Sequence, residues 1–131
     1  MSSAEKLAAL SAASSGERPS PVGNAKYRLG QKVVHVRFCS DSSTSPSKYK
    51  FNINPNTLSA DFELWVCGNS RCYYLMPLAF MREIYDNPKT YVDRMHPEIR
   101  VVSVDSRNHT VTYASGGVGA SLRSYFLATL L

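Results

Sequence analysis

Two short runs of strand-forming residues, separated by a glycine-containing turn, constrain the fold of this chain more than any other feature. The first run extends from Asp61 to Cys67, the turn is Gly-Asn-Ser-Arg, and the second run extends from Cys72 to Pro77. This arrangement predicts a β-hairpin. Because neighbouring strand residues point to opposite faces, the first strand has one apolar face and one face with two acids and a tryptophan: Phe62, Leu64 and Val66 against Asp61, Glu63, Trp65 and Cys67. The apolar face is expected to form core, so any chemistry would come from the other face.

The segments around this hairpin predict further strands and helices. Alternating runs predict strands at 32–39 and 48–53 and a second hairpin at 98–104 and 109–114, and helical spacing predicts helices at 3–14, 77–86 and 120–131. The Pro, Gly and Ser content of residues 14–24 is typical of a flexible linker. We therefore expect a short N-terminal helix and flexible linker over residues 1–25 and a single α+β domain over 26–131. That domain is expected to have a mixed or antiparallel sheet of about five to six strands with about two to three helices packed on it.

The positive charge of the chain is confined to one segment. The net charge is +5, and the residues between Lys26 and Ala60 supply all of it, with six basic residues and one acid. Acids and bases balance in the rest of the chain. Clustered positive charge favours contact with phosphates, although a basic surface without a partner remains the alternative.

Two of the expected strands carry most of this charge. Lys32 and Arg37 lie in the first, and Lys48 and Lys50 lie in the second, where Tyr49 and Phe51 are interleaved with them. Aromatic side chains between basic ones favour nucleic acid, because aromatic rings stack on bases. The same aromatic residues also suit the core of a small sheet. The candidate nucleic-acid contacts are Lys32, Arg37, Lys48, Lys50 and Tyr49.

The acids of the central hairpin are the candidates for catalysis. Asp61 and Glu63 share a strand face and have the oxygen ligands that divalent metals prefer in nucleases. Position 65, where such a site would normally have a lysine, is Trp. His35 is a possible proton carrier beside Arg37. We expect no catalysis, no metal and no cofactor, and a metal-dependent nuclease using Asp61, Glu63 and His35 is the enzymatic alternative.

The cysteines and a glycine cluster are less specific. The three cysteines have no paired-motif spacing, so neither a disulfide framework nor a zinc site is predicted. Cys67 and Cys72 are expected to face each other across the hairpin as reduced thiols, or as a bridge in an oxidising compartment. The glycine cluster at 116–119 precedes the expected last helix but lacks the spacing of a phosphate-binding loop. Both an anion site and a simple turn stay open there.

A series of motifs runs through residues 32 to 85 in a distinctive order. A His35-Val36-Arg37 strand is followed by a polar loop, a second strand, the segment Ala60–Cys67, and Tyr73–Pro77 entering a helix. This order resembles the later half of PD-(D/E)XK nuclease-like domains. His35 and Arg37 stand where that family has an acid or glutamine and a lysine. The resemblance therefore implies a degenerate member that keeps a nucleic-acid-facing sheet and has lost cleavage.

These patterns lead to two expectations of function. The first is a small non-catalytic, nuclease-like accessory protein that binds nucleic acid, DNA rather than RNA, through a basic strand pair. The alternative is a protein-interaction module, such as a regulatory, immunity or phage-type inhibitor protein, or a homodimer formed through an exposed strand. No run approaches the roughly 18 apolar residues of a membrane span, and the N-terminus lacks the features of a secretion signal. A cytoplasmic location without membrane contact is therefore expected.

Overall fold

Helices and two β-sheets make up the computed structural model, which describes residues 2–113 and 119–130. It confirms the predicted α+β class with a mixed five-stranded sheet. The helices of the described residues are α1 (Ser2–Ala13) and α2 (Leu78–Tyr85), with short 3-10 turns at Pro55–Thr57 and Arg123–Tyr125. The strands are β1 (Ser20–Gly23), β2 (Lys26–Leu29), β3 (Lys32–Cys39), β4 (Lys48–Ile53), β5 (Phe62–Cys67), β6 (Tyr73–Pro77), β7 (Tyr91–Val92), β8 (Arg100–Asp105), β9 (Thr110–Tyr113) and β10 (Ala120–Ser121).

The first sheet has the strand order β1-β2-β3-β5-β6. Its central pair, β3 and β5, is parallel, and the other pairs are antiparallel. A parallel pair needs a crossover connection, and here the crossover is β4 with the 3-10 turn after it. Part of the segment expected to be a linker forms β1, which pairs with β2.

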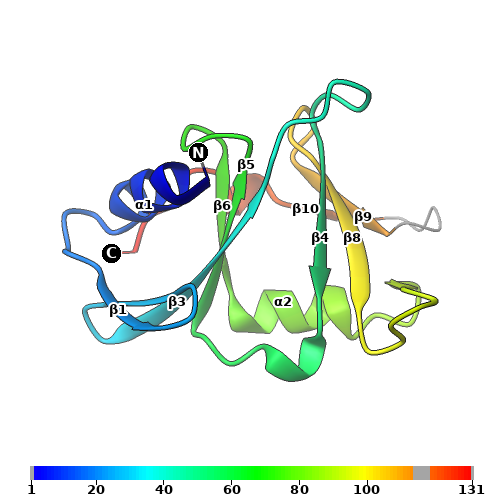
Figure 1. The fold of residues 1–131 in the computed structure, drawn as a ribbon, viewed down its shortest axis with the longest axis horizontal. Helices are drawn as coiled ribbons and strands as arrows, with labels where there is room; N and C mark the ends of the chain where they lie inside the picture. Colours follow the sequence, from blue (N-terminus) through cyan, green and yellow to red (C-terminus); the bar gives the residue numbers. More distant parts are fainter. Residues whose placement is uncertain (1, 114–118, 131) are drawn as a thin grey trace.

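The second sheet has the order β10-β9-β8-β4, and β7 also pairs with β8. It includes the predicted second hairpin, β8 and β9, as far as Tyr113, and Ala114 lies outside the described residues. The two sheets lie on opposite sides of a shared core, and α2 closes that core at one end (Figure 1). The chain therefore splits its strands between two sheets, which the sequence did not predict.

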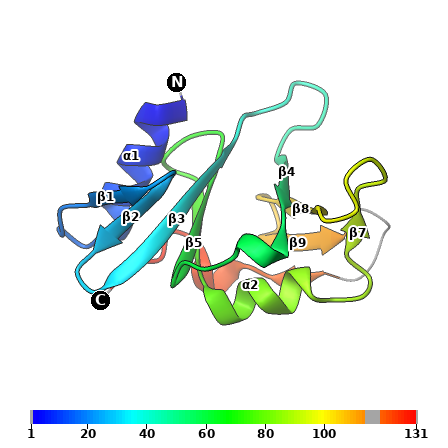
Figure 2. The ribbon, with the colours of Figure 1, turned by 60° about the horizontal axis from the view of Figure 1, so that its bottom comes forward.

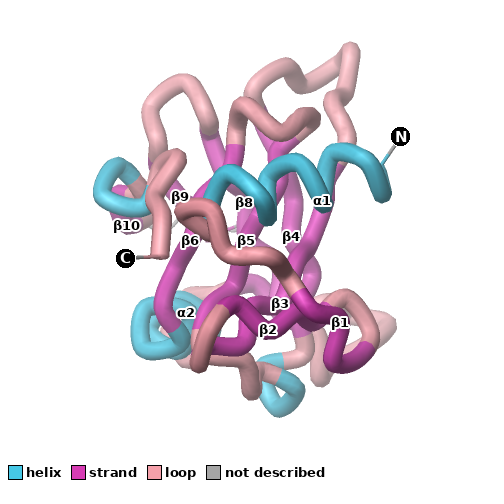
Figure 3. The backbone as a smooth tube through the Cα atoms, turned by 90° about the vertical axis from the view of Figure 1, so that its left-hand side faces the viewer, coloured by secondary structure: helices cyan, strands magenta, loops and turns pink. Residues whose placement is uncertain are grey.

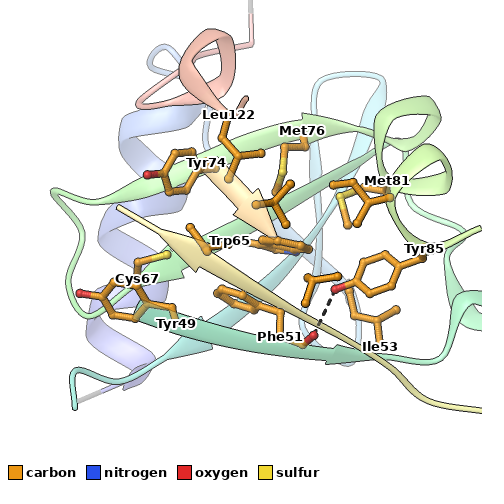
Figure 4. Close-up of a cluster of buried hydrophobic side chains, with 14 of the residues drawn as sticks. Tyr49, Phe51, Ile53, Trp65, Cys67, Tyr74, Met76, Met81, Tyr85 and Leu122 are labelled. Atoms are coloured by element: carbon orange, nitrogen blue, oxygen red, sulfur yellow. Dashed lines mark hydrogen bonds between the residues drawn. The ribbon is translucent and has the colours of Figure 1, made fainter. Parts of the chain in front are cut away.

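The central hairpin is confirmed. β5 and β6 pair in antiparallel register, and Gly68 in the turn has the positive φ of +81° that favours glycine. Both faces of β5 are covered, however. Leu64 and Val66 pack towards α1, whereas Trp65 and Cys67 point into the core between the sheets (Figure 4). The face with the tryptophan is therefore interior rather than open surface.

Aromatic side chains fill the core between the sheets. Trp65 stacks on Phe51 of β4 with ring centroids 4.4 Å apart, and Tyr85 of α2 meets its edge at 6.2 Å. The Tyr85 hydroxyl donates to the carbonyl of Phe51 at 3.2 Å (Figure 4). These contacts join one strand of each sheet to α2, so the tryptophan holds the two sheets together.

The N-terminal helix docks on the outer face of the first sheet. Ala9, Leu10 and Ala13 of α1 are buried against that sheet, and Figure 3 shows the helix lying across its strands. The Glu5 carboxylate accepts a 2.6 Å hydrogen bond from the backbone of Ser70 in the central turn. The helix thus packs as part of the body of this chain.

The predicted closing helix at 120–131 is wrong. The chain forms β10 and a short 3-10 turn, and Phe126 then pairs with Tyr74 of β6 through a backbone bridge. Leu122 is fully buried in the core between the sheets, and Leu127 has a positive φ of 53°. Of the glycine cluster, residues 116–118 lie outside the described residues, and no α-helix follows Gly119 within residues 119–130.

Candidate nucleic-acid interface

One face of strands β2 and β3 gathers basic side chains. Lys26 pairs with His35 and Arg28 pairs with Val33 in the β2–β3 register, so these residues share a face with Arg37. The opposite face of these two strands, which includes Val34, packs under α1. On β5 and β6 the corresponding face is covered by the second sheet, but the side chains on β2 and β3 are only partly buried. We call Lys26, Arg28, His35 and Arg37 the basic face.

The basic face lies at the outer part of the first sheet. Figure 2 shows β1, β2 and β3 on the side of the molecule away from β8 and β9. Arg28 is exposed, Lys26 is partly exposed, and the side chains of His35 and Arg37 are 15% and 24% exposed. All four side chains therefore have some exposed surface, and Arg28 is the most open of them.

A buried carboxylate lies at the inner edge of this face. Glu63, on β5 beside β3, is 2% exposed and pairs in register with His35. One of its oxygens, Oε1, accepts a hydrogen bond from Arg37 Nε at 2.9 Å and lies 3.2 Å from His35 Nδ1. Burying a carboxylate is costly unless it is paired and hydrogen-bonded. The two β3 side chains meet that requirement, so Glu63 fixes their positions.

The pairing also orients the two β3 side chains. An ionised carboxylate only accepts hydrogen bonds, so His35 donates from Nδ1 and its Nε2 is the ring nitrogen left for another partner. Arg37 contacts Glu63 through Nε. The terminal amino groups of its guanidinium are separate donors. Arg37 can therefore hold the carboxylate and still donate to an anion.

Asp61 and Glu63 contact different groups. The Asp61 carboxylate is exposed and accepts a 2.8 Å hydrogen bond from the backbone of Val33. Within residues 2–113 and 119–130, no group of three or more His, Cys, Asp and Glu side chains could hold a metal ion. Each acid instead bonds to groups of the first sheet. In the described part of the chain, no further His, Cys, Asp or Glu side chain completes a metal site with them.

The five predicted nucleic-acid contacts do not converge. Arg37 lies on the basic face, whereas Lys32 projects from the α1 side of the same sheet. Lys48 and Lys50 project from the outer side of the second sheet, and Lys48 Nζ donates to Asp105 at 2.9 Å. The basic strand pair expected from the sequence is thus divided between two sheets.

Tyr49 is placed in the core and is 6% exposed. Its hydroxyl donates to Asp41 at 2.6 Å, and burial, with this hydrogen bond, raises the pKa of Tyr49. The ring is therefore not positioned to stack on a base, and the neighbouring Phe51 is buried against Trp65. The interleaving of aromatic and basic residues in β4 separates a core side from a solvent side.

Lys26 and Arg28 are members of the basic face that the sequence reasoning did not select. They were counted in the positive segment, but β2 is four residues long and was not predicted as a strand. Lys26 Nζ donates to the Ser59 hydroxyl at 2.9 Å. The alternation of Lys26 and Arg28 with Tyr27 and Leu29, which face α1, was the available signal.

Comparisons of the chain with protein-family models, curated proteins and solved structures found no match. None of the helices in the described part of the chain has the length and apolar character needed to cross a membrane.

Proposed function

We propose that this chain binds the phosphate backbone of a nucleic acid through the basic face and does not cleave it. The observation that supports the proposal is the shared, accessible face of β2 and β3, which carries Lys26, Arg28 and Arg37. Neighbouring strands lie about 4.8 Å apart, and alternate residues of a strand lie about 6.6 Å apart. Three cations at these spacings form a compact patch suited to adjacent phosphates.

The acids of the site limit the strength of this binding. Glu63 offsets the charge of Arg37, so Lys26 and Arg28 supply most of the net positive charge of the face. About two to three phosphate contacts predict weak, strongly salt-dependent binding without base selectivity. A DNA partner and a degenerate nuclease-like ancestry remain predictions from the sequence.

The absence of cleavage rests on what the acids contact. Metal-dependent nucleases use carboxylates to hold the ion that activates water. Glu63 is instead bound to Arg37 and His35, and Asp61 to the backbone of β3. The basic face thus has phosphate-binding groups, whereas both carboxylates near it are already bound to the protein.

A fluorescence-polarisation titration with short labelled DNA, single-stranded and duplex, tests the proposal at about 50 mM salt, where phosphate contacts are strong. The variant Lys26→Gln/Arg28→Gln should bind at least about tenfold more weakly than the unmodified chain, because it loses about two phosphate contacts. The matched control is Arg94→Gln/Arg107→Gln, which removes two exposed arginines outside the basic face and should bind normally. No binding by the unmodified chain, or equal loss in both variants, would refute the proposal.

A protein-interaction module is the second candidate function. It is favoured by exposed apolar residues in the segment between α2 and β8, where Tyr91, Val92 and Met95 are 36%, 39% and 83% exposed. Exposed apolar clusters mark interaction surfaces more often than isolated exposed residues do. A Val92→Ser/Met95→Ser variant that loses a co-purifying protein, while the Lys26→Gln/Arg28→Gln variant keeps it, would support this function over DNA binding.

A further inference from the structure

Two cysteines meet at the closed end of the central hairpin. Val66 and Tyr73 are paired in the β5–β6 register, and Cys67 and Cys72 are the next facing residues. The backbone N–H of Cys67 donates to the carbonyl of Cys72 at 2.8 Å. Residues that face each other in an antiparallel pair have Cα atoms about 4.5–5.5 Å apart, which lies within the range of about 4.4–6.8 Å that a disulfide spans.

The two cysteine side chains are close enough to influence each other's ionisation, and they differ in exposure. Cys67 is fully buried and Cys72 is partly exposed. A reagent from solvent can therefore reach Cys72, while Cys67 is held against it from the core side.

The environment gives the two sulfurs different roles. The hydrogen bond from Cys67 lowers the pKa of the Cys72 thiol, opposed by burial and supported by the bond from Ser106. The same hydrogen bond, together with burial, raises the pKa of the Cys67 thiol. A thiolate is the nucleophilic form of cysteine, so the accessible sulfur is also the more reactive one.

We propose that Cys67 and Cys72 form an oxidisable dithiol, in which Cys72 reacts with a hydroperoxide and Cys67 then closes a reversible disulfide across the hairpin. This site is independent of the basic face. The sequence left this pair open as two reduced thiols or as a bridge, and the proposal links the two states by a defined reaction.

The reaction balances without any further reagent. The Cys72 thiolate attacks one oxygen of the hydroperoxide, the O–O bond breaks, and a Cys72 sulfenic acid and an alkoxide or hydroxide form. The alkoxide or hydroxide takes up the proton that the Cys72 thiol lost. The Cys67 sulfur then attacks the Cys72 sulfur, the S–O bond breaks, and hydroxide leaves and takes up the Cys67 proton. Two thiols are oxidised to one disulfide, and the peroxide is reduced to an alcohol or water and a second water.

Cys39 is the internal comparison. It lies beside Cys67 in the parallel β3–β5 register, and its thiol donates to the carbonyl of Ser40 at 3.7 Å. It has access similar to that of Cys72, but it lies on β3 outside the hairpin, and its thiol is directed to the Ser40 carbonyl. The proposal therefore predicts that Cys39 stays reduced.

Trypsin separates the three cysteines, because cleavage after Arg37, Lys48, Lys50, Arg71 and Arg82 places them on peptides 38–48, 51–71 and 72–82. The reduced protein is treated with hydrogen peroxide, its remaining thiols are alkylated, and the digest is analysed by mass spectrometry without reduction. We expect peptides 51–71 and 72–82 joined, peptide 38–48 alkylated, and complete reversal by dithiothreitol. Separate alkylated peptides, or a bridge that includes peptide 38–48, would overturn the proposal.

Two comparisons separate native geometry from closeness in sequence. Oxidation in about 6 M urea should be at least about tenfold slower, because the folded hairpin holds the thiols together. Equal rates in the folded and unfolded chain would contradict the proposal. Cys39→Ser should form the bridge at the normal rate, whereas Cys67→Ser should lose it and leave Cys72 as the oxidised cysteine. The peptide map of the unmodified chain decides the pairing even if a variant fails to fold.

Discussion

Replacement of Arg37 by methionine isolates the energetic role of the buried glutamate. Met is close to Arg in length but cannot donate a hydrogen bond. Glu63 is 2% exposed, and its carboxylate is bonded to Arg37 and His35. In Arg37→Met, His35 is the one of these two donors that remains. The stability of the protein should fall, because a buried charge loses its closest partner.

The size of the loss follows from the geometry. Breaking a fully buried ion pair by removing one partner costs about 3–5 kcal/mol. The Arg37 side chain is 24% exposed, and His35 remains 3.2 Å from the same carboxylate oxygen, so we expect the lower value of about 2–3 kcal/mol. With a urea m-value of about 2 kcal/mol per molar, the unfolding midpoint should fall by about 1–1.5 M.

The paired replacement separates an unpaired charge from lost packing. In Arg37→Met/Glu63→Leu both charged groups are gone, and replacing a buried pair with apolar residues is often neutral. This double variant should therefore be within about 1 kcal/mol of the unmodified protein. Arg94→Met, at an exposed position, is the control and should change stability by less than about 0.5 kcal/mol.

Urea unfolding followed by the fluorescence of Trp65 measures all four proteins. Trp65 is the single tryptophan of the chain and is fully buried between the sheets, so its signal reports the core directly. If Arg37→Met were as stable as the unmodified protein, the Glu63 pairing would have no energetic role. If the double variant were less stable than Arg37→Met alone, packing rather than charge would explain the loss.

Three further changes have defined outcomes. Gly68→Ala should lower the free energy of unfolding by at least about 2 kcal/mol, because φ is +81° and the new Cβ would meet the Asp41 carboxylate. Gly30 has a φ of +62° but open space around it, so Gly30→Ala should lower the free energy of unfolding less in the same urea titration. Tyr49→Phe should cost about 1 kcal/mol in thermal unfolding, since it removes the 2.6 Å bond to Asp41, and an unchanged melting temperature would argue against that bond. Burial raises the pKa of Asp105, but hydrogen bonds from a lysine and two backbone amides lower it further than burial raises it. Asp105 should therefore contribute stability that is present above about pH 4 and lost as the pH falls below it. Asp105→Asn should remove this pH-dependent loss of stability from an acid-unfolding curve. Identical curves for the variant and the unmodified protein would contradict the role of Asp105.

The alternation of residues predicted the local geometry of the central hairpin but not its surroundings. The sequence correctly placed Trp65 and Glu63 on one face of β5, because that pattern depends only on the strand period. What covers this face depends on β4. This strand belongs to the second sheet and brings Phe51 against Trp65 from the other side of the core. A contact between distant segments has no local signature, so the buried state of Glu63 could not be predicted.

The C-terminal error has a similar cause. Leu122, Phe126 and Leu130 have helical spacing in the sequence, but in the structure each one packs separately against other elements. Leu122 enters the core between the sheets, and Leu130 packs in the core under α1, where its backbone N–H donates to Ala13 at 2.8 Å. Tertiary contacts override the intrinsic preference of such a segment for helix.

The candidate site was only partly predictable. The count of charges selected the segment, and of the five predicted contacts Arg37 is the one that lies on the basic face. Which basic side chains share a face depends on the β2–β3 register, which places Arg28 opposite Val33. It also depends on the separation of β3 and β4 into different sheets, which removes Lys48 and Lys50 from that face.

The salt dependence of DNA binding tests the central claim most directly. Each phosphate contact contributes about −0.9 to the slope of log K against log salt on duplex DNA. Binding through the basic face predicts a slope of about −2 to −3 for the unmodified protein, which should become about 2 units less steep in Lys26→Gln/Arg28→Gln. The Arg94→Gln/Arg107→Gln control should keep the original slope. A slope that is unchanged in the Lys26→Gln/Arg28→Gln variant would contradict the claim that this face binds the phosphate backbone.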